Sequence, residues 1–550
     1  MTISVRSLTI VLLLFCFAWG QTADARAARP NVLLIVTDDM AFSDWGAFGG
    51  EIKTPHIDEL ASEGVRMANY YVSPTCSPTR AMLMTGIDHH MVGLGTMAEL
   101  LQPNQLGKPG YEGYLNNRAV TLSELLRDAG YATMIAGKWH LGEGPEQDPS
   151  RKGFDRSFVL LEGGTSHFGD EWMLYPNYTP VYRQDGQRVH LPPGFYSSNF
   201  YTDQIIEWLK AKRDDQPFFA YLAFTAPHDP LHVPEDRLSD YKGVYDDGYD
   251  ALSERRMARM KALGIVPSHA VAAPRPAFIP GWTDLMPSEQ ERQARAMEIY
   301  AAMVGIIDDN VGRLVDALKM RREYENTLVI IFSDNGANGH TMTAYPGVSE
   351  AWLNRNSDNR PENLGNRGSR ISVGPGWALA GMTPFRMFKT FITEGGMRSP
   401  LIIRGTVGAR AGTIGHAIAD VRDIMPTVLE LAEIVPPPRY QGRDVLPVQG
   451  LSMVPFLQGH QEEVHPKDQV FGYELFGWHG VRQGPWKATW IGPPVGANKW
   501  QLFNLDLDPG ETRDLAGDQP ARLSKLKMLW KQYAAEVGLV LPEKPSFRPH

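Results

Sequence analysis

Residues 31–39 read Asn-Val-Leu-Leu-Ile-Val-Thr-Asp-Asp, and residues 327–336 read Thr-Leu-Val-Ile-Ile-Phe-Ser-Asp-Asn-Gly. In each stretch an unbroken apolar run ends in acidic or amide side chains. Such runs, without polar alternation, are typical of strands that are covered on both faces of a parallel sheet. The polar residues then follow the carboxyl ends of the strands, where open α/β sheets bind their ligands.

Other segments continue this alternation of strands and helices. The pattern predicts further strands over 132–136 and 217–224, and helices over 57–69, 122–129, 423–432 and from Pro287 onward. In the last of these helices, Ser288 and Glu291 have the spacing of a capping box. Together these elements predict a large α/β sheet with helices on both faces.

The chain then changes character at Pro436-Pro437-Pro438, which we interpret as a hinge between domains. Short strand-like pieces follow between 471 and 503, and a last helix is predicted over 521–537. We therefore expect three parts: a signal peptide over 1–25, a main domain over 26–435 and a smaller α+β domain over 436–550. The irregular stretches 236–282 and 337–384 are interpreted as insertions that shape a ligand pocket.

The composition excludes some partners. The 550 residues carry a formal net charge of -9, and no block of basic residues interrupts the chain. An acidic surface repels polyanions, so no nucleic-acid partner is expected. No later segment approaches 18 uninterrupted apolar residues, so no membrane association is expected once the signal peptide has been cleaved.

The N-terminus predicts export. Arg6 precedes an apolar run over 8–20, and Ala23-Asp24-Ala25 fits a cleavage site, so residues 1–25 are interpreted as a signal peptide of a secreted or periplasmic protein. A retained membrane anchor is the alternative. The chain has two cysteines, and cleavage would remove Cys16 and leave Cys76. A single remaining thiol forms no internal disulfide, so it is buried, intermolecular or chemically special.

The acidic residues at the two strand ends are candidate metal ligands. Asp38, Asp39, Asp334 and Asn335 all offer oxygen atoms, which suit hard cations such as Ca²⁺ or Mg²⁺ better than zinc. Either pair alone is more often explained as a helix N-cap, because the side chain then accepts from free backbone N–H groups. Two such pairs in one chain favour a shared metal site.

Two longer motifs carry a resemblance to a known family. Residues 74–86 read Pro-Thr-Cys-Ser-Pro-Thr-Arg-Ala-Met-Leu-Met-Thr-Gly, and residues 130–140 read Gly-Tyr-Ala-Thr-Met-Ile-Ala-Gly-Lys-Trp-His. Both resemble motifs of the formylglycine-dependent type I sulfatases, an arylsulfatase-like group in the alkaline phosphatase superfamily. Pro78 is also suited to begin a helix, which would place Cys76 beside free backbone N–H groups. The resemblance extends from Asn31 to about Leu515.

The resemblance implies a mixed, mostly parallel sheet and a set of site residues. It implies that a divalent cation, Ca²⁺ in preference to Mg²⁺, is bound by Asp38, Asp39, Asp334, Asn335 and an oxygen of formylglycine made from Cys76. It also implies catalytic roles for Arg80, Lys138, His140, His228 and Lys389. Arg80 would contact the nucleophile, the two lysines would bind sulfate, and His228 would protonate the leaving oxygen. His340 begins the loop after Asn335 and could touch the substrate.

The implied reaction is hydrolysis of a sulfate monoester to an alcohol and inorganic sulfate. A hydrated-aldehyde oxygen attacks sulfur, the alcohol leaves, and the covalent sulfate is then eliminated. A formylglycine-generating or equivalent maturation enzyme is an implied partner, and aryl or small alkyl sulfates are the expected substrates. A formylglycine-dependent phosphonate monoester or phosphodiester hydrolase is the main alternative. A catalytically silent binding protein and a thiol enzyme with unmodified Cys76 are the others.

Overall fold

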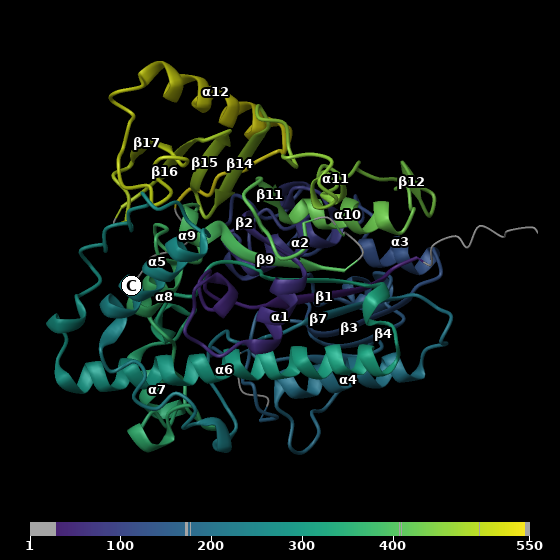
Figure 1. Ribbon diagram of the computed structural model, residues 1–550, viewed down its shortest axis with the longest axis horizontal. Helices are drawn as coiled ribbons and strands as arrows, with labels where there is room; N and C mark the ends of the chain where they lie inside the picture. The colour runs from purple at the N-terminus through teal and green to yellow at the C-terminus, as the bar shows by residue number, and fades with distance from the viewer. Residues whose placement is uncertain are drawn as a thin grey trace, which may run out of the picture.

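The computed structural model describes residues 29–170, 174–176, 178–405, 408, 410–493 and 495–544, and the predicted signal peptide lies outside these ranges. They form the predicted α/β fold, an eleven-stranded sheet with helices on both faces (Figure 1). Its strands are β1 (Asn31–Thr37), β2 (Val65–Tyr71), β3 (Ala132–Lys138), β4 (Arg156–Leu160), β5 (Tyr182–Gln184), β6 (Gln187–Val189), β7 (Phe218–Ala223), β8 (Thr327–Ser333), β9 (Arg398–Arg404), β10 (Ile414–Gly415) and β11 (Ala419–Asp420). None of the helices in these ranges has the length and apolar character needed to cross a membrane.

The strand order is β10-β2-β9-β8-β1-β7-β3-β4-β5-β6, and β11 also pairs with β2. The central strands β8, β1, β7, β3 and β4 are parallel to their neighbours within this group. Strand β9 runs antiparallel to both β8 and β2, and β5 and β6 add antiparallel pairs at the other edge. The sheet is therefore mixed and mostly parallel, as the resemblance implies.

Helices cover both faces of the sheet. The main helices are α1 (Pro55–Glu63), α2 (Cys76–Thr85), α3 (Leu122–Asp128), α4 (Ser197–Ala211), α6 (Pro287–Met320), α9 (Glu394–Met397) and α10 (Ile424–Leu431). Along β1, Leu33 and Ile35 pack into the cluster that includes α4 and α6, whereas Val32, Leu34 and Val36 pack into the cluster that includes α2, α3 and α10. This alternation explains why the strand is apolar at every position.

The C-terminal part forms a separate sheet. Its elements are β12 (Arg439–Tyr440), β13 (Arg443–Asp444), α11 (Val454–Leu457), β14 (Val470–Leu475), β15 (Trp478–Gln483), β16 (Trp486–Ile491), β17 (Lys499–Asn504) and α12 (Pro520–Glu536). Strands β14 to β17 pair antiparallel in chain order, and α12 packs against them. Met453, Phe456 and Val464 instead join the main core. The domain division at residue 436 stays a prediction.

Two local predictions are wrong. The helix predicted over 57–69 ends at Glu63, and Val65–Tyr71 forms strand β2 because it pairs with the distant strand β9. The predicted capping box at Ser288 is absent, since α6 begins at Pro287 with Met286 as its N-cap. A proline at the first helical position starts the helix without a side-chain cap.

The two stretches interpreted as insertions contain helices that the sequence did not reveal. Residues 236–282 include α5 (Gly248–Leu263), and residues 337–384 include α7 (Glu350–Asn356) and α8 (Pro375–Met382). Helices α5 and α8 pack on each other beside the main sheet. Part of the second stretch, residues 338–346, reaches the cavity described below.

Candidate active site

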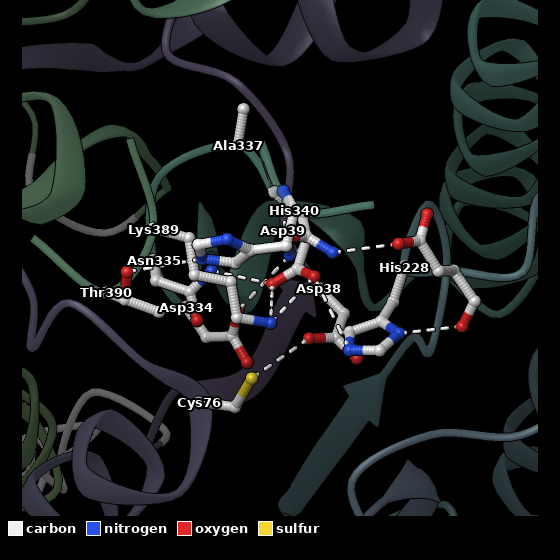
Figure 2. A network of polar contacts seen from close by, with 12 residues as sticks. Asp38, Asp39, Cys76, His228, Asp334, Asn335, Ala337, His340, Lys389 and Thr390 are labelled. Atoms are coloured by element: carbon white, nitrogen blue, oxygen red, sulfur yellow. Dashed lines mark hydrogen bonds and ion pairs between the residues drawn. The ribbon is translucent and has the colours of Figure 1, made fainter. Parts of the chain in front are cut away.

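The ends of β1 and β8 lie side by side, as their parallel pairing requires. Thr37 pairs with Ser333, and the backbone N–H of Asp334 donates to the Thr37 carbonyl at 3.0 Å. The next residue after Asp38, Asp39, has a φ of 67°, a left-handed conformation that turns the chain away from the strand direction. As a result, the side chains of Asp38, Asp39 and Asp334 converge in the buried interior (Figure 2).

Cys76 reaches the same cluster from a different element, helix α2. It is the first residue of α2, so the helix begins two residues earlier than the predicted start at Pro78. Its Sγ lies 3.5 Å from Asp38 Oδ1, and the side chain is buried. Burial raises the pKa of the Cys76 thiol above its ordinary value. The unmodified thiol is therefore protonated near neutral pH and is a weak nucleophile.

The clustered donor atoms fit a hard divalent cation. One ligand atom from each of Asp38, Asp39, Cys76 and Asp334 lies within 4.8 Å of all the others. Asn335 adds a buried Oδ1 with no hydrogen-bond partner in the part of the chain that the structure describes, while its Nδ2 donates to Asp39 Oδ1 at 2.7 Å. Carboxylate and amide oxygens are the ligands that Ca²⁺ and Mg²⁺ prefer, and an orphaned buried oxygen beside three carboxylates is the environment such an ion needs.

Three buried cations balance the three carboxylates. Arg80 donates from Nε and Nη2 to Asp334 Oδ2 at 3.0 and 2.8 Å, and from Nη1 to the Lys138 carbonyl. Lys138 Nζ lies 2.7 and 2.9 Å from the two oxygens of Asp38. Lys389 Nζ lies 2.7 and 2.8 Å from the two oxygens of Asp39. Every one of these side chains is buried, so the charges act on one another with little screening.

These contacts fix the charge states. Burial alone would raise the pKa of Asp39, but Lys389, His228 and Lys138 outweigh burial and hold that pKa well below its usual range. Burial would likewise lower the pKa of Lys138, but Asp38 outweighs it and raises that pKa. The lysines therefore stay cationic and Asp39 stays ionised, which leaves a strongly polar centre inside an apolar sheet.

Two histidines face this centre from irregular segments. His228 lies after β7, with Nδ1 2.8 Å from the Asp229 carbonyl and Nε2 3.4 Å from Asp39 Oδ2. Because a carbonyl only accepts, Nδ1 carries the hydrogen and Nε2 points toward the cluster. Burial lowers the pKa of His228 to about 3, so the ring is neutral in this state. His140 follows β3, and its Nε2 lies 3.6 Å from Glu99 Oε1.

A cavity of about 370 Å³ opens beside these groups. Cys76, His140, His228 and Lys389 line it, which brings four of the predicted catalytic residues to one wall. The other predicted site residues lie in the buried cluster described above: Asp38, Asp39, Asp334, Asn335, Arg80 and Lys138. His340, which the sequence left unassigned, also lines the cavity, and its Nε2 lies 3.2 Å from Thr390 Oγ1.

Other lining residues were not predicted. These residues lie on several segments whose sequences show no periodic pattern: Met97, Glu99, Leu100, Tyr175, Tyr178, Asn338, Tyr345 and Phe476. Both irregular stretches had been expected to shape a pocket. The stretch 337–384 contributes Asn338, His340 and Tyr345, whereas no residue of 236–282 is among the described lining residues. Phe476 comes from the C-terminal sheet, so both parts of the chain build the cavity.

Comparison with known proteins identifies relatives along nearly the whole chain. The profile of the sulfatase family matches residues 30–434. An uncharacterized sulfatase of Schizosaccharomyces pombe is 42% identical over 536 residues, which cover 94% of this chain and 95% of the relative. An arylsulfatase of Klebsiella aerogenes is 40% identical over 437 residues, which cover 79% of this chain and 93% of the relative.

Solved structures share the fold. The protein Ps i-CgsB, crystallised with a neocarrahexaose, matches with a TM-score of 0.65 and 24% identity over 95% of both chains. A phosphonate monoester hydrolase of Agrobacterium radiobacter matches with a TM-score of 0.55 and 20% identity over 92% of this chain and 96% of the other. The α/β fold of this chain is the one that these solved structures share. The chain itself belongs to the sulfatase family, whose enzymes are sulfuric ester hydrolases.

Proposed function

We propose that this enzyme hydrolyses sulfate monoesters of phenols or small alcohols, using formylglycine made from Cys76 and a bound divalent cation. The observation that carries the proposal is the convergence of Asp38, Asp39, Asp334 and Cys76, whose ligand atoms lie within 4.8 Å of one another beside the cavity. The arylsulfatase relative at 40% identity supports the choice of an aryl ester. Tyrosine and phenylalanine side chains around the cavity support it as well.

The cation would be held by Asp38, Asp39, Asp334 and Asn335, together with an oxygen of the modified residue 76. We favour Ca²⁺ because the donors are carboxylate and amide oxygens, and Mg²⁺ is compatible with the same set. When present, the cation and the hydrated aldehyde supply Lewis acidity and an oxygen nucleophile. The orphaned Oδ1 of Asn335 supports this assignment, because the described part of the chain offers it no hydrogen-bond donor.

The lysines would bind and orient the sulfate group. Lys389 lines the cavity, and Lys138 lies directly behind it on Asp38. Both ammonium groups are compact, buried cations of the kind that bind sulfate oxygens. Arg80 would have a different role, since it donates two hydrogen bonds to Asp334 and holds that carboxylate in place.

His228 would transfer a proton to the leaving oxygen. Its Nδ1–H is held by the Asp229 carbonyl, so the transferred proton must reside on Nε2. Because the ring is neutral in this state, the imidazolium that carries this proton would form when the anionic substrate is bound, with Asp39 3.4 Å away as its counter-charge. His140 would contact the nucleophile from the other side of the cavity, where it is held near Glu99.

The burial of Cys76 bears on its maturation. The residue is 1% exposed and begins a buried helix, so a modifying enzyme has no access to it in the folded chain. We therefore propose that a formylglycine-generating or equivalent enzyme acts before folding is complete. Export to the periplasm or the medium, directed by residues 1–25, is part of the same proposal.

The proposal is tested by mass and by turnover. Intact-protein mass spectrometry of the enzyme, expressed with a maturation enzyme, should show Cys76 converted to the aldehyde. The same protein should release sulfate from 4-nitrophenyl sulfate, and Cys76→Ala should reduce kcat/KM by about 10⁴-fold or more, because the nucleophile is lost. Full activity with an unmodified thiol at residue 76 would contradict the mechanism.

A phosphodiester substrate separates the alternative function. Bis(4-nitrophenyl) phosphate offers the same leaving group, and a phosphonate monoester or phosphodiester hydrolase should prefer it. We expect kcat/KM for the sulfate ester to be higher. Removal of the divalent cation by a chelator should abolish turnover of both esters, and Ca²⁺ should restore it.

A further inference from the structure

The cavity has two ends with different electrostatic character. At the inner end Lys389 is the only lysine or arginine among the described lining residues, and it is paired with Asp39. At the outer end lies Glu99, the only carboxylate among the described lining residues. Its side chain is 29% exposed, compared with 9% for His140, so the carboxylate lies nearer to solvent than the histidine does.

Glu99 forms no ion pair with a lysine or arginine in the described structure. Its ion-pair contact there is His140 Nε2 at 3.6 Å, and burial lowers the pKa of that histidine. Burial would raise the pKa of Glu99 itself, but contacts with His140 outweigh burial and lower it. Glu99 therefore presents a negative charge to whatever occupies the outer end.

Two aromatic rings line the same cavity as this charge. The ring centroids of Tyr175 and Tyr178 are 4.5 Å apart, and both residues share the cavity lining with Glu99. Aromatic faces next to a carboxylate attract ammonium groups through cation–π and charge interactions, and they accept neutral rings by stacking.

We propose that Glu99 is a specificity-determining residue that selects sulfate esters whose leaving group is neutral or positively charged at the end remote from the sulfate. A second negative charge on the leaving group would face the Glu99 carboxylate inside a partly desolvated cavity, where repulsion is weakly screened. A quaternary ammonium substituent would instead lie between that carboxylate and the two tyrosines. This inference rests on the proposed sulfatase function and narrows its substrate class.

The test compares three para-substituted phenyl sulfates that carry a trimethylammonium, a tert-butyl or a carboxylate group. The first two substituents have nearly the same shape and differ in charge. We expect Glu99→Gln to reduce the kcat/KM ratio of the ammonium to the tert-butyl ester by about tenfold. It should raise the ratio of the carboxylate to the tert-butyl ester by a similar factor. Intrinsic ester reactivity cancels, because each ratio is compared between two proteins.

Glu146→Gln is the matched control. Glu146 is an exposed acid in the segment after His140 and does not line the cavity, so both ratios should stay within about twofold of wild type. If Glu99→Gln lowers kcat/KM for all three esters equally, Glu99 acts only by positioning His140, and the specificity inference is overturned. The inference is also overturned if Glu146→Gln shifts the ratios as much as Glu99→Gln does.

A binding measurement separates this inference from the proposed function. Isothermal titration calorimetry with 4-(trimethylammonio)benzenesulfonate and 4-tert-butylbenzenesulfonate requires no turnover. We expect Glu99→Gln to weaken binding of the ammonium compound about tenfold relative to binding of the tert-butyl compound. An unchanged Kd ratio would overturn the role of Glu99 even in an active sulfatase. A changed ratio in a protein that hydrolyses none of the esters would support the charge selection and contradict the proposed function.

Discussion

Two buried clusters of metal-ligating side chains lie in the described part of this molecule, and only one of them borders the cavity that His140 and His228 line. The first is Asp38, Asp39, Cys76 and Asp334, and the second is Asp88, His89 and His90. Both are buried and both carry acidic groups. Residue type and burial alone therefore do not separate a candidate active site from a structural cluster.

The difference lies in how the polar atoms are satisfied. In the second cluster, Nδ1 of His90 contacts Asp88 Oδ1 at 2.9 Å, and Nε2 contacts Glu474 Oε2 at 3.1 Å. Tyr533 donates to Asp88 Oδ2 at 2.9 Å. The second cluster thus ties the segment after α2 to β14 and α12, and its ring nitrogens and carboxylates bond to other protein groups. In the first cluster Asn335 Oδ1 has no hydrogen-bond partner among the described residues, and Cys76 of that cluster lines the cavity, which is what a ligand site requires.

The largest expected effect on activity comes from a pair of Asp→Asn variants, one in each cluster, which test this comparison. Asp334→Asn keeps the shape of the side chain but removes the charge that Arg80 pairs with, and it weakens the proposed cation site. We expect kcat/KM for 4-nitrophenyl sulfate to fall by about a hundredfold or more. Because Arg80 is left buried without its partner, stability should also fall by about 3 kcal/mol.

Asp88→Asn removes a buried carboxylate of the second cluster in the same way. It should lower the thermal midpoint, because His90 loses one of its two acids, while kcat/KM stays within about threefold of wild type. The interpretation of the two clusters fails if Asp88→Asn proves as inactive as Asp334→Asn in protein that circular dichroism finds folded.

The histidine of the second cluster is also held differently from the two histidines near the first, and a pair of glycine variants tests this difference. His90 is held by two carboxylates, whereas His140 and His228 pack against the backbone at Gly163 and Gly164. A Cβ at Gly163 would lie 2.8 Å from His140 Cε1, and one at Gly164 would lie 3.0 Å from His228 Cε1. Each alanine therefore displaces a different ring by a few tenths of an ångström.

We expect each of these alanine variants to reduce kcat/KM by about tenfold, since small displacements of catalytic groups are costly. The variants should differ in their dependence on the leaving group. Gly164→Ala should affect esters of poorly acidic phenols more than 4-nitrophenyl sulfate, because His228 protonates the leaving oxygen. Gly163→Ala should affect all esters alike. Equal leaving-group dependence for both variants would argue against His228 as the acid.

How far the sequence reaches can be judged from particular residues. The ends of β1 and β8 were predictable because each signal is local, an apolar run followed by Asp38-Asp39 or Asp334-Asn335. Strand β2 was not, because Val65–Tyr71 becomes a strand only by pairing with β9, β10 and β11, more than 300 residues later. Glu99, Tyr175 and Phe476 were missed for a related reason. They come from three irregular segments that tertiary packing alone brings to one cavity.

The smallest expected effect concerns stability and pH, and it isolates the second cluster. Burial would lower the pKa of His90, but hydrogen bonds and ion pairs with Asp88 and Glu474 outweigh burial and raise it from 6.5 to about 9. The groups that face the ring are Asp88, His89, Tyr111, Glu474 and Tyr533. Because the folded-state pKa is the higher one, the charged ring stabilises the protein below about pH 6.5.

That stabilisation, about 3 kcal/mol, is lost as the pH rises through 9. Between pH 6 and pH 10 the thermal midpoint of the wild type should therefore fall by about 3 °C more than that of His90→Gln. His460→Gln, at an exposed position, should retain the wild-type difference. If His90→Gln shows the same pH dependence as the wild type, the ring is not a charged clamp. The contrast between the two clusters would then rest on Asn335 Oδ1 alone, which has no hydrogen-bond partner among the described residues.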